Sequence, residues 1–353
     1  MPTRYDVSHD ELAALLEDEP RYRVDQVWAG LYDQHRGPEE LTTLPKALRT
    51  RLAEQLPPAL SPAAESVSDE GDTVKWLWEL HDGARVETVL MHYPDRSTAC
   101  VSTQAGCAMA CGFCATGQAG FERNLSAGEI VEQVVRAARV AGGSEPSRRL
   151  SNVVFMGMGE PMANYDRVWE AIGRIHGDVG LSARHLTLST VGLVPGIRRM
   201  ATEALPVNLA VSLHAADDEL RDELVPINRR YPLEVLYEAC EVYLEAKGRR
   251  LSFEWALIDG VNDRGRDADA LAAAARRLRA HVNLIPLNAT PGWPTTGSPP
   301  ERVAAFRDHL RDLGVNATVR ANRGTDIDAA CGQLRAAHEV TLGEPRRRPA
   351  ARP

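Results

Sequence analysis

The chain has 353 residues and a formal net charge of −8, and 44% of its residues are hydrophobic and 25% charged. This composition is that of an ordinary globular protein with one large domain and room for a small accessory domain. The acidic balance argues against a protein that coats nucleic acid through a uniformly basic surface. No apolar run approaches the length of a membrane-spanning helix, and acidic residues stand where a secretory signal would be apolar. We therefore expect a cytoplasmic protein with no membrane partner.

Residues 1–58 are expected to form a separate helical module. Ser8 and Glu11 have the spacing of a capping box, and apolar residues in VDQVWAGLY and LPKALRTRLAEQL recur at helical intervals. The proline-rich stretch PPALSP then reads as a linker. The alternating stretches TVKWLWEL and RVETVLM, on either side of HDGA, predict a β-hairpin within residues 63–92.

Short apolar strands alternate with amphipathic helices over residues 93–340, and SAGEIVEQVVRAARV is an example of such a helix. Repeated strand–helix units predict an α/β fold with a parallel sheet, and six units predict a partial (β/α)6 barrel. Residues 341–353 form a basic tail that we expect to be disordered. The six expected strands are TACVST, NVVFM, HLTLS, VNLAVSL, LSFEWALI and HVNLIPLN.

Polar or glycine-rich residues stand at the ends of five of these strands. The C-terminal strand ends of a parallel barrel carry its active site, so we expect these residues to line one pocket. They are the cysteine loop after TACVST, GMGEP after NVVFM, Ser189 in HLTLST, Ser212-Leu213-His214 after VNLAV and Asn288 in NLIPLN.

The cysteine loop CAMACGFC places Cys107, Cys111 and Cys114 at the spacing C-x3-C-x2-C. Zinc sites and ferredoxin clusters normally take four protein ligands, and no further cysteine follows at a matching spacing. Three thiolates suit a [4Fe-4S] cluster with one open iron, and an open coordination position is what a catalytic metal site needs. The remaining cysteines are isolated: Cys100, Cys331 and Cys240, the last on the apolar face of an expected helix, where it reads as inert.

This spacing, at the start of a strand–helix repeat, resembles the signature of the radical S-adenosylmethionine superfamily. The resemblance implies that the amino and carboxylate groups of S-adenosylmethionine chelate the open iron, and that reduction cleaves the molecule to a 5'-deoxyadenosyl radical. GMGEP matches the superfamily motif that meets the methionyl amino group at Gly159 and Glu160. The resemblance implies further cofactor contacts at Ser189, Ser212, Leu213, His214 and Asn288.

A set of longer motifs runs in order along most of the chain. They include YRVDQVWAGLY, ARVETVLM, CVSTQAGC, FERNLSAGEI, VVFMGMGEP, VSLHAADDELRDELVPIN and RGTDIDAACGQL. In these motifs the chain resembles one family within that superfamily, the rRNA adenine C2-methyltransferases. The resemblance implies methylation of one adenosine of 23S rRNA and also of the adenosine beside the tRNA anticodon. It also implies a low-potential electron donor of the flavodoxin or ferredoxin type, and we expect a monomer.

Adenine chemistry explains why such an enzyme needs two further thiols. Carbon 2 is electron-poor and cannot attack a sulfonium methyl group, so a radical must add to it. The resemblance implies that Cys331 takes a methyl group from one S-adenosylmethionine, and that a radical from a second one turns this group into a methylene radical. The methylene radical adds to carbon 2 and joins protein to RNA. Cys100 then releases the methylated base and leaves a Cys100–Cys331 disulfide, while Glu87 matches the family's proton acceptor.

The helical module is the expected additional RNA contact. It is rich in Asp and Glu, so the contact would depend on Arg21, Arg23, Gln26 and Lys46. Chemistry at a base edge requires the base to leave its stack, which favours recognition of RNA shape and of single-stranded features.

Two alternative functions stay open. A C8-methylating rRNA methyltransferase of the antibiotic-resistance type shares the cluster motif and both further cysteines, although QAGCAMACGFCATGQAG and DIDAACGQL favour the C2 type. A non-enzymatic iron–sulfur or zinc protein that binds RNA is the alternative of another class, and it would leave Cys100 and Cys331 without a role.

Overall fold

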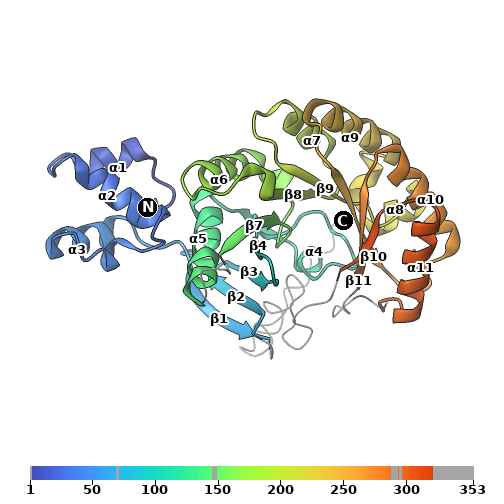
Figure 1. Cartoon of the computed structure of the whole chain (residues 1–353), viewed down its shortest axis with the longest axis horizontal. Helices are drawn as coiled ribbons and strands as arrows, with labels where there is room; N and C mark the ends of the chain where they lie inside the picture. Colours follow the sequence, from blue (N-terminus) through green and yellow to red (C-terminus); the bar gives the residue numbers. More distant parts are fainter. Residues whose placement is uncertain (1, 69–70, 145–148, 288–292, 294–295, 321–353) are drawn as a thin grey trace, which may run out of the picture. The chain divides into compact units, whose positions relative to one another are not determined.

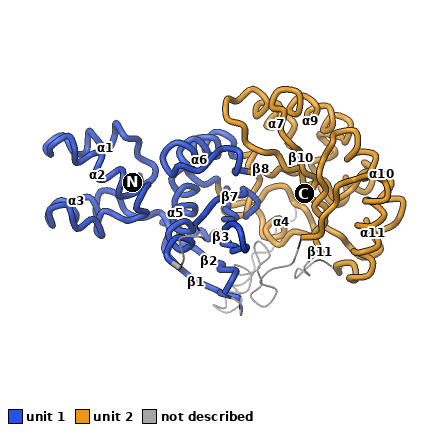
Figure 2. The backbone as a smooth tube through the Cα atoms, viewed as in Figure 1, with its two compact units in different colours: residues 1–103, 124–157, 164–186 blue, residues 104–123, 158–163, 187–353 orange. Residues whose placement is uncertain are grey.

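The computed structural model describes residues 2–68, 71–144, 149–287, 293 and 296–320. The chain divides into two compact units, drawn in blue and orange in Figure 2. Unit 1 comprises residues 1–103, 124–157 and 164–186, and unit 2 comprises residues 104–123, 158–163 and 187–353. Within the described ranges, no helix combines the length and the apolar character that a bilayer crossing requires.

Unit 1 begins with the expected helical module. Its helices are α1 (His9–Leu15), α2 (Tyr22–Tyr32) and α3 (Lys46–Gln55), with a 3-10 turn at Pro38–Glu40. The Ser8 side chain accepts a hydrogen bond from the Glu11 N–H, and the Glu11 carboxylate accepts one from the Ser8 N–H, so the predicted capping box is present. Leu12, Val27, Leu31 and Leu52 are completely buried and form the core of the module.

A mixed sheet makes up the second part of unit 1, with the strand order β1-β2-β3-β4-β7. The strands are β1 (Ser61–Val67), β2 (Thr73–Glu79), β3 (Arg85–His92), β4 (Ser97–Cys100) and β7 (Leu150–Phe155). β1 to β4 pair antiparallel, so β2 and β3 form the expected hairpin, and β7 pairs parallel with β4. Helix α5 (Ala127–Ser144) packs against β3, β4 and β7, and α6 (Tyr165–Gly177) packs against α5 (Figure 1).

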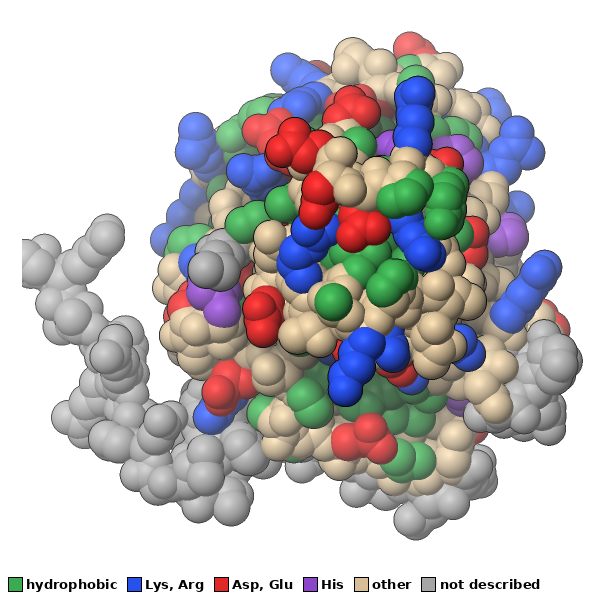
Figure 3. Space-filling view, turned by 90° about the vertical axis from the view of Figure 1, so that its left-hand side faces the viewer, with side chains coloured by type: hydrophobic (Ala, Val, Ile, Leu, Met, Phe, Trp, Pro, Cys, Tyr) green, Lys and Arg blue, Asp and Glu red, His purple; other side chains and the backbone are tan. Residues whose placement is uncertain are grey.

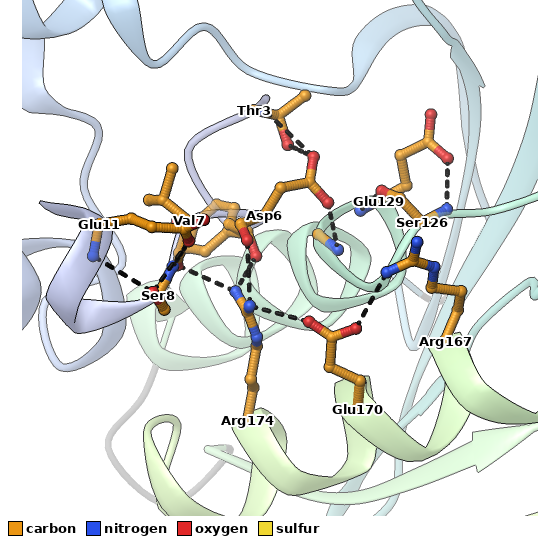
Figure 4. A network of polar contacts seen from close by, with 12 residues as sticks. Thr3, Asp6, Val7, Ser8, Glu11, Ser126, Glu129, Arg167, Glu170 and Arg174 are labelled. Atoms are coloured by element: carbon orange, nitrogen blue, oxygen red, sulfur yellow. Dashed lines mark hydrogen bonds and ion pairs between the residues drawn. The ribbon is translucent and has the colours of Figure 1, made fainter. Parts of the chain in front are cut away.

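The segment before α1 is held on α5 and α6 by polar contacts (Figure 4). The Asp6 carboxylate accepts a hydrogen bond of 2.9 Å from the Gly128 N–H in the first turn of α5, where a negative charge also meets the positive end of the helix dipole. Arg174 of α6 donates to the backbone carbonyls of Tyr5, Asp6 and Val7. The N-terminal segment is therefore fastened by side chains far along the chain.

Unit 2 contains a parallel sheet with the strand order β8-β9-β10-β11-β12. The strands are β8 (Leu186–Thr190, with Leu186 still in unit 1), β9 (Asn208–Ser212), β10 (Leu251–Leu257), β11 (His281–Pro286) and β12 (Ala317–Val319). The helices between them are α7 (Val194–Thr202), α8 (Asp218–Leu224), α9 (Leu233–Lys247), α10 (Gly265–Arg277) and α11 (Pro300–Asp312). Of the further 3-10 turns, Pro226–Arg229 belongs to unit 2, Ala183–His185 belongs to unit 1, and Pro161–Asn164 lies where the chain passes from unit 2 to unit 1.

The fold class is α/β, and all six strands that the sequence predicts for a partial barrel are present as β4, β7, β8, β9, β10 and β11. The strand β12 was not predicted, because three residues carry no readable alternation. A small second sheet was also missed. It joins β5 (Gln104–Gly106) to β6 (Phe121–Asn124) and, together with the short helix α4 (Ala115–Ala119), surrounds the cysteine loop.

Candidate active site

The cysteine loop is closed at its base by the β5–β6 ribbon. The Cys107 N–H donates to the Gly120 carbonyl at 2.8 Å, and the Gln118 side chain donates to the Gly112 carbonyl at 2.6 Å. Gly106 has a φ of +74°, and a Cβ placed on it would lie 1.9 Å from the Gly120 carbonyl oxygen. The two strands can therefore approach this closely only because residue 106 is glycine.

The three thiols of the loop are held in a poorly solvated place. Cys111 is buried, while Cys107 and Cys114 are half-buried. Burial raises the pKa of Cys107 to about 12, and burial followed by the charges of Cys114 and Cys107 raises the pKa of Cys111. A positively charged group bound at this loop would stabilise the thiolate forms of these cysteines.

These thiols fit a four-iron cluster better than a single metal ion. Within the described part of the chain, no group of three or more His, Cys, Asp or Glu converges on one ion. In a four-iron cluster each thiolate binds a different iron, so the three sulfur atoms need not converge on one point. Three thiols in one loop of small residues can bind three of the irons and leave the fourth for another ligand.

The loop also packs against the ends of β9 and β10. Cys111 and Phe113 belong to an apolar cluster with Ala215, Ala256 and Ile258. The rings of Phe113 and His214 meet edge to face, with their centroids 4.8 Å apart. The predicted His214 therefore lies directly beside the cysteine loop.

His214 is held in one protonation state. Its Nδ1 accepts a hydrogen bond of 3.0 Å from the Ala256 N–H, so the proton of the neutral ring is on Nε2. Burial, with the nearby charge of Arg221, lowers the pKa of His214 to about 3. The residue has a φ of +60°, an uncommon backbone conformation that is concentrated at functional sites. His214 can thus donate from Nε2 at any physiological pH.

The backbone around the GMGEP segment is held in place by hydrogen bonds to its own glutamate. Glu160 is 2% exposed, and its two carboxylate oxygens accept backbone hydrogen bonds from Met162 and Val191, each at 2.9 Å. Burial raises the pKa of Glu160 to about 7, against the opposing effect of these donors. Gly159 has a φ of +101°, and a Cβ there would lie 2.7 Å from the backbone nitrogen of Gln104. The segment is thereby held with its backbone close to β5.

Strand register places the two predicted serines on the same face of the unit 2 sheet. Ser189 pairs with Ala210, and Ser212 lies two residues beyond Ala210 on the same strand. Glu254 pairs with Ser212 and therefore shares this face; burial raises the pKa of its carboxyl. Ser189, Ser212, His214 and Glu160 all belong to unit 2, like the cysteine loop.

Arg221 connects the strand ends that carry these residues. It is 0% exposed, and its guanidinium donates to the Leu213 carbonyl at 3.0 Å, to the Val191 carbonyl at 2.6 Å and to the Asn228 side chain at 2.7 Å. Burial lowers its pKa to about 10, so it remains charged at neutral pH. Sequence reasoning missed this residue because ADDELRDEL has the charge pattern of a solvated helix face.

Glu87 and Cys100 both belong to unit 1 and lie on one face of its sheet. Cys100 pairs with Val89, and Glu87 lies two residues before Val89. A glutamate in an alternating strand is ordinarily solvent-facing, but Glu87 is 2% exposed and forms an ion pair of 2.9 Å with the buried Lys75. Lys75 was not predicted, although its position in TVKWLWEL already placed a charge between apolar residues.

Asn288 and Cys331 lie outside the described residues. The isolated Cys240 is completely buried in α9, as expected of an inert cysteine, and burial raises its pKa to about 12.

A three-thiol loop at the start of a parallel strand–helix repeat defines the class of radical S-adenosylmethionine enzymes, and residues 101–272 match the family model described as the Radical SAM superfamily. A solved radical SAM methyltransferase from Sphaerobacter thermophilus is 49% identical, with a TM-score of 0.89, and the match covers 94% of this chain and 99% of that one.

Relatives with named functions identify one family within this superfamily. A protein of Chloroflexus aurantiacus named "Probable dual-specificity RNA methyltransferase RlmN" is 52% identical over 352 residues, which cover 96% of this chain and 94% of that protein. A protein of Salinispora tropica with the same name is 55% identical over 332 residues, which cover 90% and 88%. This chain belongs to the RlmN family of radical S-adenosylmethionine RNA methyltransferases. Membership implies a [4Fe-4S] cluster and S-adenosylmethionine as cofactors.

Proposed function

We propose that this enzyme methylates carbon 2 of one adenosine in 23S rRNA and of the adenosine beside the tRNA anticodon. The strand register of β3 and β4 carries the proposal, because it puts a carboxylate, Glu87, and a thiol, Cys100, on one sheet face. Methyl transfer to an electron-poor ring carbon through a protein–RNA adduct needs both a proton acceptor and a second thiol. The dual specificity in the relatives' name supports two RNA substrates.

We assign the cofactors to residues of unit 2. Cys107, Cys111 and Cys114 would bind the cluster, and the backbone at Gly159 and Glu160 would meet the methionyl end of S-adenosylmethionine. When bound, the cluster and S-adenosylmethionine would supply the radical chemistry that removes hydrogen from a methyl group, and two S-adenosylmethionine molecules would be used in each turnover. Further contacts to S-adenosylmethionine are assigned to Ser189, Ser212, Leu213, His214 and Asn288.

Two thiols and one carboxylate of this chain are assigned the remaining steps, which are methyl transfer, proton removal and release of the adduct. Cys331 carries the methyl group and becomes the covalent link to carbon 2. Glu87 accepts the proton of carbon 2. Cys100, as a thiolate, attacks the Cys331 sulfur, and the disulfide forms as the bond between Cys331 and the methylene carbon breaks. The methylene carbon keeps the electron pair of that bond and takes up a proton, which makes it the methyl group of the product.

We assign residues 1–58 to an RNA-binding accessory domain, 63–92 to a hairpin extension, 93–340 to the catalytic partial barrel and 341–353 to a basic tail. The face that carries α1 to α3 shows Lys and Arg side chains interspersed with Asp and Glu, without a continuous basic surface (Figure 3). On this module Arg23 and Gln26 of α2 bond to each other and both bond to Thr43, which gives a defined polar edge for RNA. A monomer and a flavodoxin- or ferredoxin-type electron donor complete the proposal.

A map of methylated adenosines by mass spectrometry tests the proposed position and substrates. Ribosomal RNA and tRNA from cells with and without the gene are digested and compared. We expect 2-methyladenosine to disappear from both RNAs when the gene is absent. An 8-methyladenosine would instead identify the antibiotic-resistance type of enzyme, and an unchanged tRNA would restrict the substrate to ribosomal RNA.

Replacement of Cys100 tests the two-thiol route. Cys100→Ala should be purified with RNA covalently bound at Cys331, because the adduct forms but is not released. Cys240→Ala is the matched control, since Cys240 is buried in α9 and has no part in the proposed chemistry. Peptide mass spectrometry after nuclease digestion identifies the adduct. Recovery of Cys100→Ala without RNA, from cells in which the wild-type enzyme is active, would contradict the route.

A further inference from the structure

The sheet of unit 1 separates two sets of side chains. Thr88 faces α5, because its hydroxyl donates to the Gln133 side chain of that helix at 2.9 Å. Trp78 is on the same face, since its indole N–H donates to the Thr88 hydroxyl at 3.0 Å. Successive side chains of a strand point to opposite faces, so Glu87 points away from α5.

One row of paired residues crosses this opposite face. Lys75 on β2 pairs with Val89 on β3, and Val89 pairs with Cys100 on β4. Lys75 therefore shares the face of Glu87 and Cys100. The ionisable side chains on this face of the three strands are Lys75 and Glu79 of β2, Arg85 and Glu87 of β3, and Cys100 of β4.

Lys75 and Glu87 form an ion pair under unusual conditions. The distance from Lys75 Nζ to Glu87 Oε2 is 2.9 Å, and the two side chains are 0% and 2% exposed. Removal of two charges from water costs several kcal/mol for each ion, so a buried pair is weak evidence for a stabilising role. The neighbouring pair on this face, Arg85 and Glu79 at 3.2 Å, differs in that its glutamate is 46% exposed. The burial of Lys75 and Glu87 is therefore better explained by a functional role than by a contribution to the free energy of unfolding.

We propose that Lys75 is the positioning residue of the proton acceptor, holding the Glu87 carboxylate ionised and in one orientation on the Cys100 face. This inference rests on the proposed role of Glu87. In the step it serves, the C–H bond at carbon 2 of the radical adduct breaks. The proton moves to a Glu87 oxygen, the electron pair of the bond stays with the ring, and the one surplus electron of the adduct would pass to the cluster that Cys107, Cys111 and Cys114 would hold. Lys75 remains an ammonium ion throughout. The cation is needed because a buried carboxylate without one favours its protonated form, which cannot accept a proton.

The experiment measures release of the protein–RNA adduct as a function of pH in reconstituted full-length enzyme. In Lys75→Met we expect release at neutral pH to slow at least tenfold, and the acid limb of the profile to move upward by about 1–3 pH units. The direction follows from the charge: without Lys75 the carboxyl stays protonated to higher pH, so activity returns as the pH rises. Lys75→Arg keeps the cation and should restore the wild-type profile to within a few-fold.

Three controls separate this inference from its premises. Formation of 5'-deoxyadenosine and methylation of Cys331 should be unchanged in all Lys75 variants, because both precede proton transfer. Lys75→Gln keeps a hydrogen-bond donor beside Glu87, and it carries the test if Lys75→Met proves unfolded by circular dichroism. Glu87→Gln tests the premise: normal adduct release in this variant would overturn the proposed role of Glu87.

A different result would overturn the role of Lys75 while leaving that of Glu87 intact. If Glu87→Gln blocks release while Lys75→Met and Lys75→Gln keep the wild-type acid limb, Lys75 is only a structural residue. If the Lys75 variants release the adduct more slowly by the same factor at every pH, Lys75 is likewise only structural. A shifted limb that Lys75→Arg reverses supports the inference.

Discussion

Arg221 illustrates how a single buried charge can set the geometry of a site. Its guanidinium satisfies carbonyls just beyond two neighbouring strands, at Val191 after β8 and at Leu213 after β9. Five N–H donors in a fixed planar fork allow one side chain to hold several acceptors at once, which a lysine cannot do. The positions of Ser189 and of the Ser212–His214 segment therefore depend on a residue that need not touch the cofactor.

Arg221→Lys should therefore weaken both the fold and the site, even though lysine keeps the positive charge. We expect a loss of about 3 kcal/mol in the free energy of unfolding, because buried carbonyls are left without donors, and weaker binding of S-adenosylmethionine. Arg307→Lys is the control, since Arg307 lies on α11 and its partner among the described residues is the exposed Asp308. Urea denaturation and isothermal titration of the reconstituted enzyme measure both effects. Equal behaviour of the two variants would contradict this role.

At the scale of elements, the β5–β6 ribbon gives the cysteine loop its shape. The ribbon brings Gly106 and Gly120 together at the base of the loop, and both glycines have positive φ, +74° and +82°. Their surroundings differ, because a Cβ on residue 106 meets backbone at 1.9 Å, whereas a Cβ on residue 120 meets nothing within 4 Å. The two positions therefore separate the cost of backbone conformation from the cost of a steric clash.

Gly106→Ala and Gly120→Ala form a matched pair. Gly120→Ala should cost about 1–3 kcal/mol, because its φ of +82° and ψ of −176° lie in a region of backbone conformation that is essentially restricted to glycine. Gly106→Ala also has a positive φ to accommodate and must in addition separate the two strands, so we expect it to lose most of its bound iron. Iron analysis and the visible absorption of the reconstituted proteins measure cluster content. Equal iron content in the two variants would show that the ribbon does not hold the loop.

On the scale of the whole molecule, the N-terminal module is joined to the rest of unit 1 through backbone carbonyls. Arg174 holds three consecutive residues, Tyr5 to Val7, and Asp6 reaches the first turn of α5. Burial raises the pKa of Asp6, but hydrogen bonds from Thr3, Ser126 and the Gly128 N–H outweigh burial and lower it below its usual value. The stability that ionised Asp6 contributes is therefore complete at neutral pH and is lost only as the pH falls through this lowered pKa.

Arg174→Met should loosen the module while leaving the cluster site intact. We expect earlier proteolytic cleavage between α3 and β1 and a large loss of RNA methylation, with 5'-deoxyadenosine still formed. Arg167→Met is the control on the same helix, because Arg167 is 63% exposed and its partner within the described part of the chain is Glu170. Limited proteolysis followed by mass spectrometry reports the cleavage. An identical digestion pattern in the two variants would contradict the anchoring role.

Much of the fold was predictable because local patterns determine it. The six strands are short apolar runs bounded by turn residues, and the capping box of Ser8 and Glu11 is legible from spacing alone. The short strands β5, β6 and β12 were not predictable, because three or four residues carry no period and form strands only where a partner is already in place.

The sequence alone indicates the class of enzyme, because it contains three thiols at the C-x3-C-x2-C spacing, the further cysteines Cys100 and Cys331, and a family pattern over nearly the whole chain. The tertiary structure is needed to show which charged side chains are buried. Lys75 and Arg221 are both 0% exposed, and neither was predicted to be buried. The physical reason is that burial depends on what packs against a residue from distant parts of the chain, and spacing along a strand or helix does not contain that information.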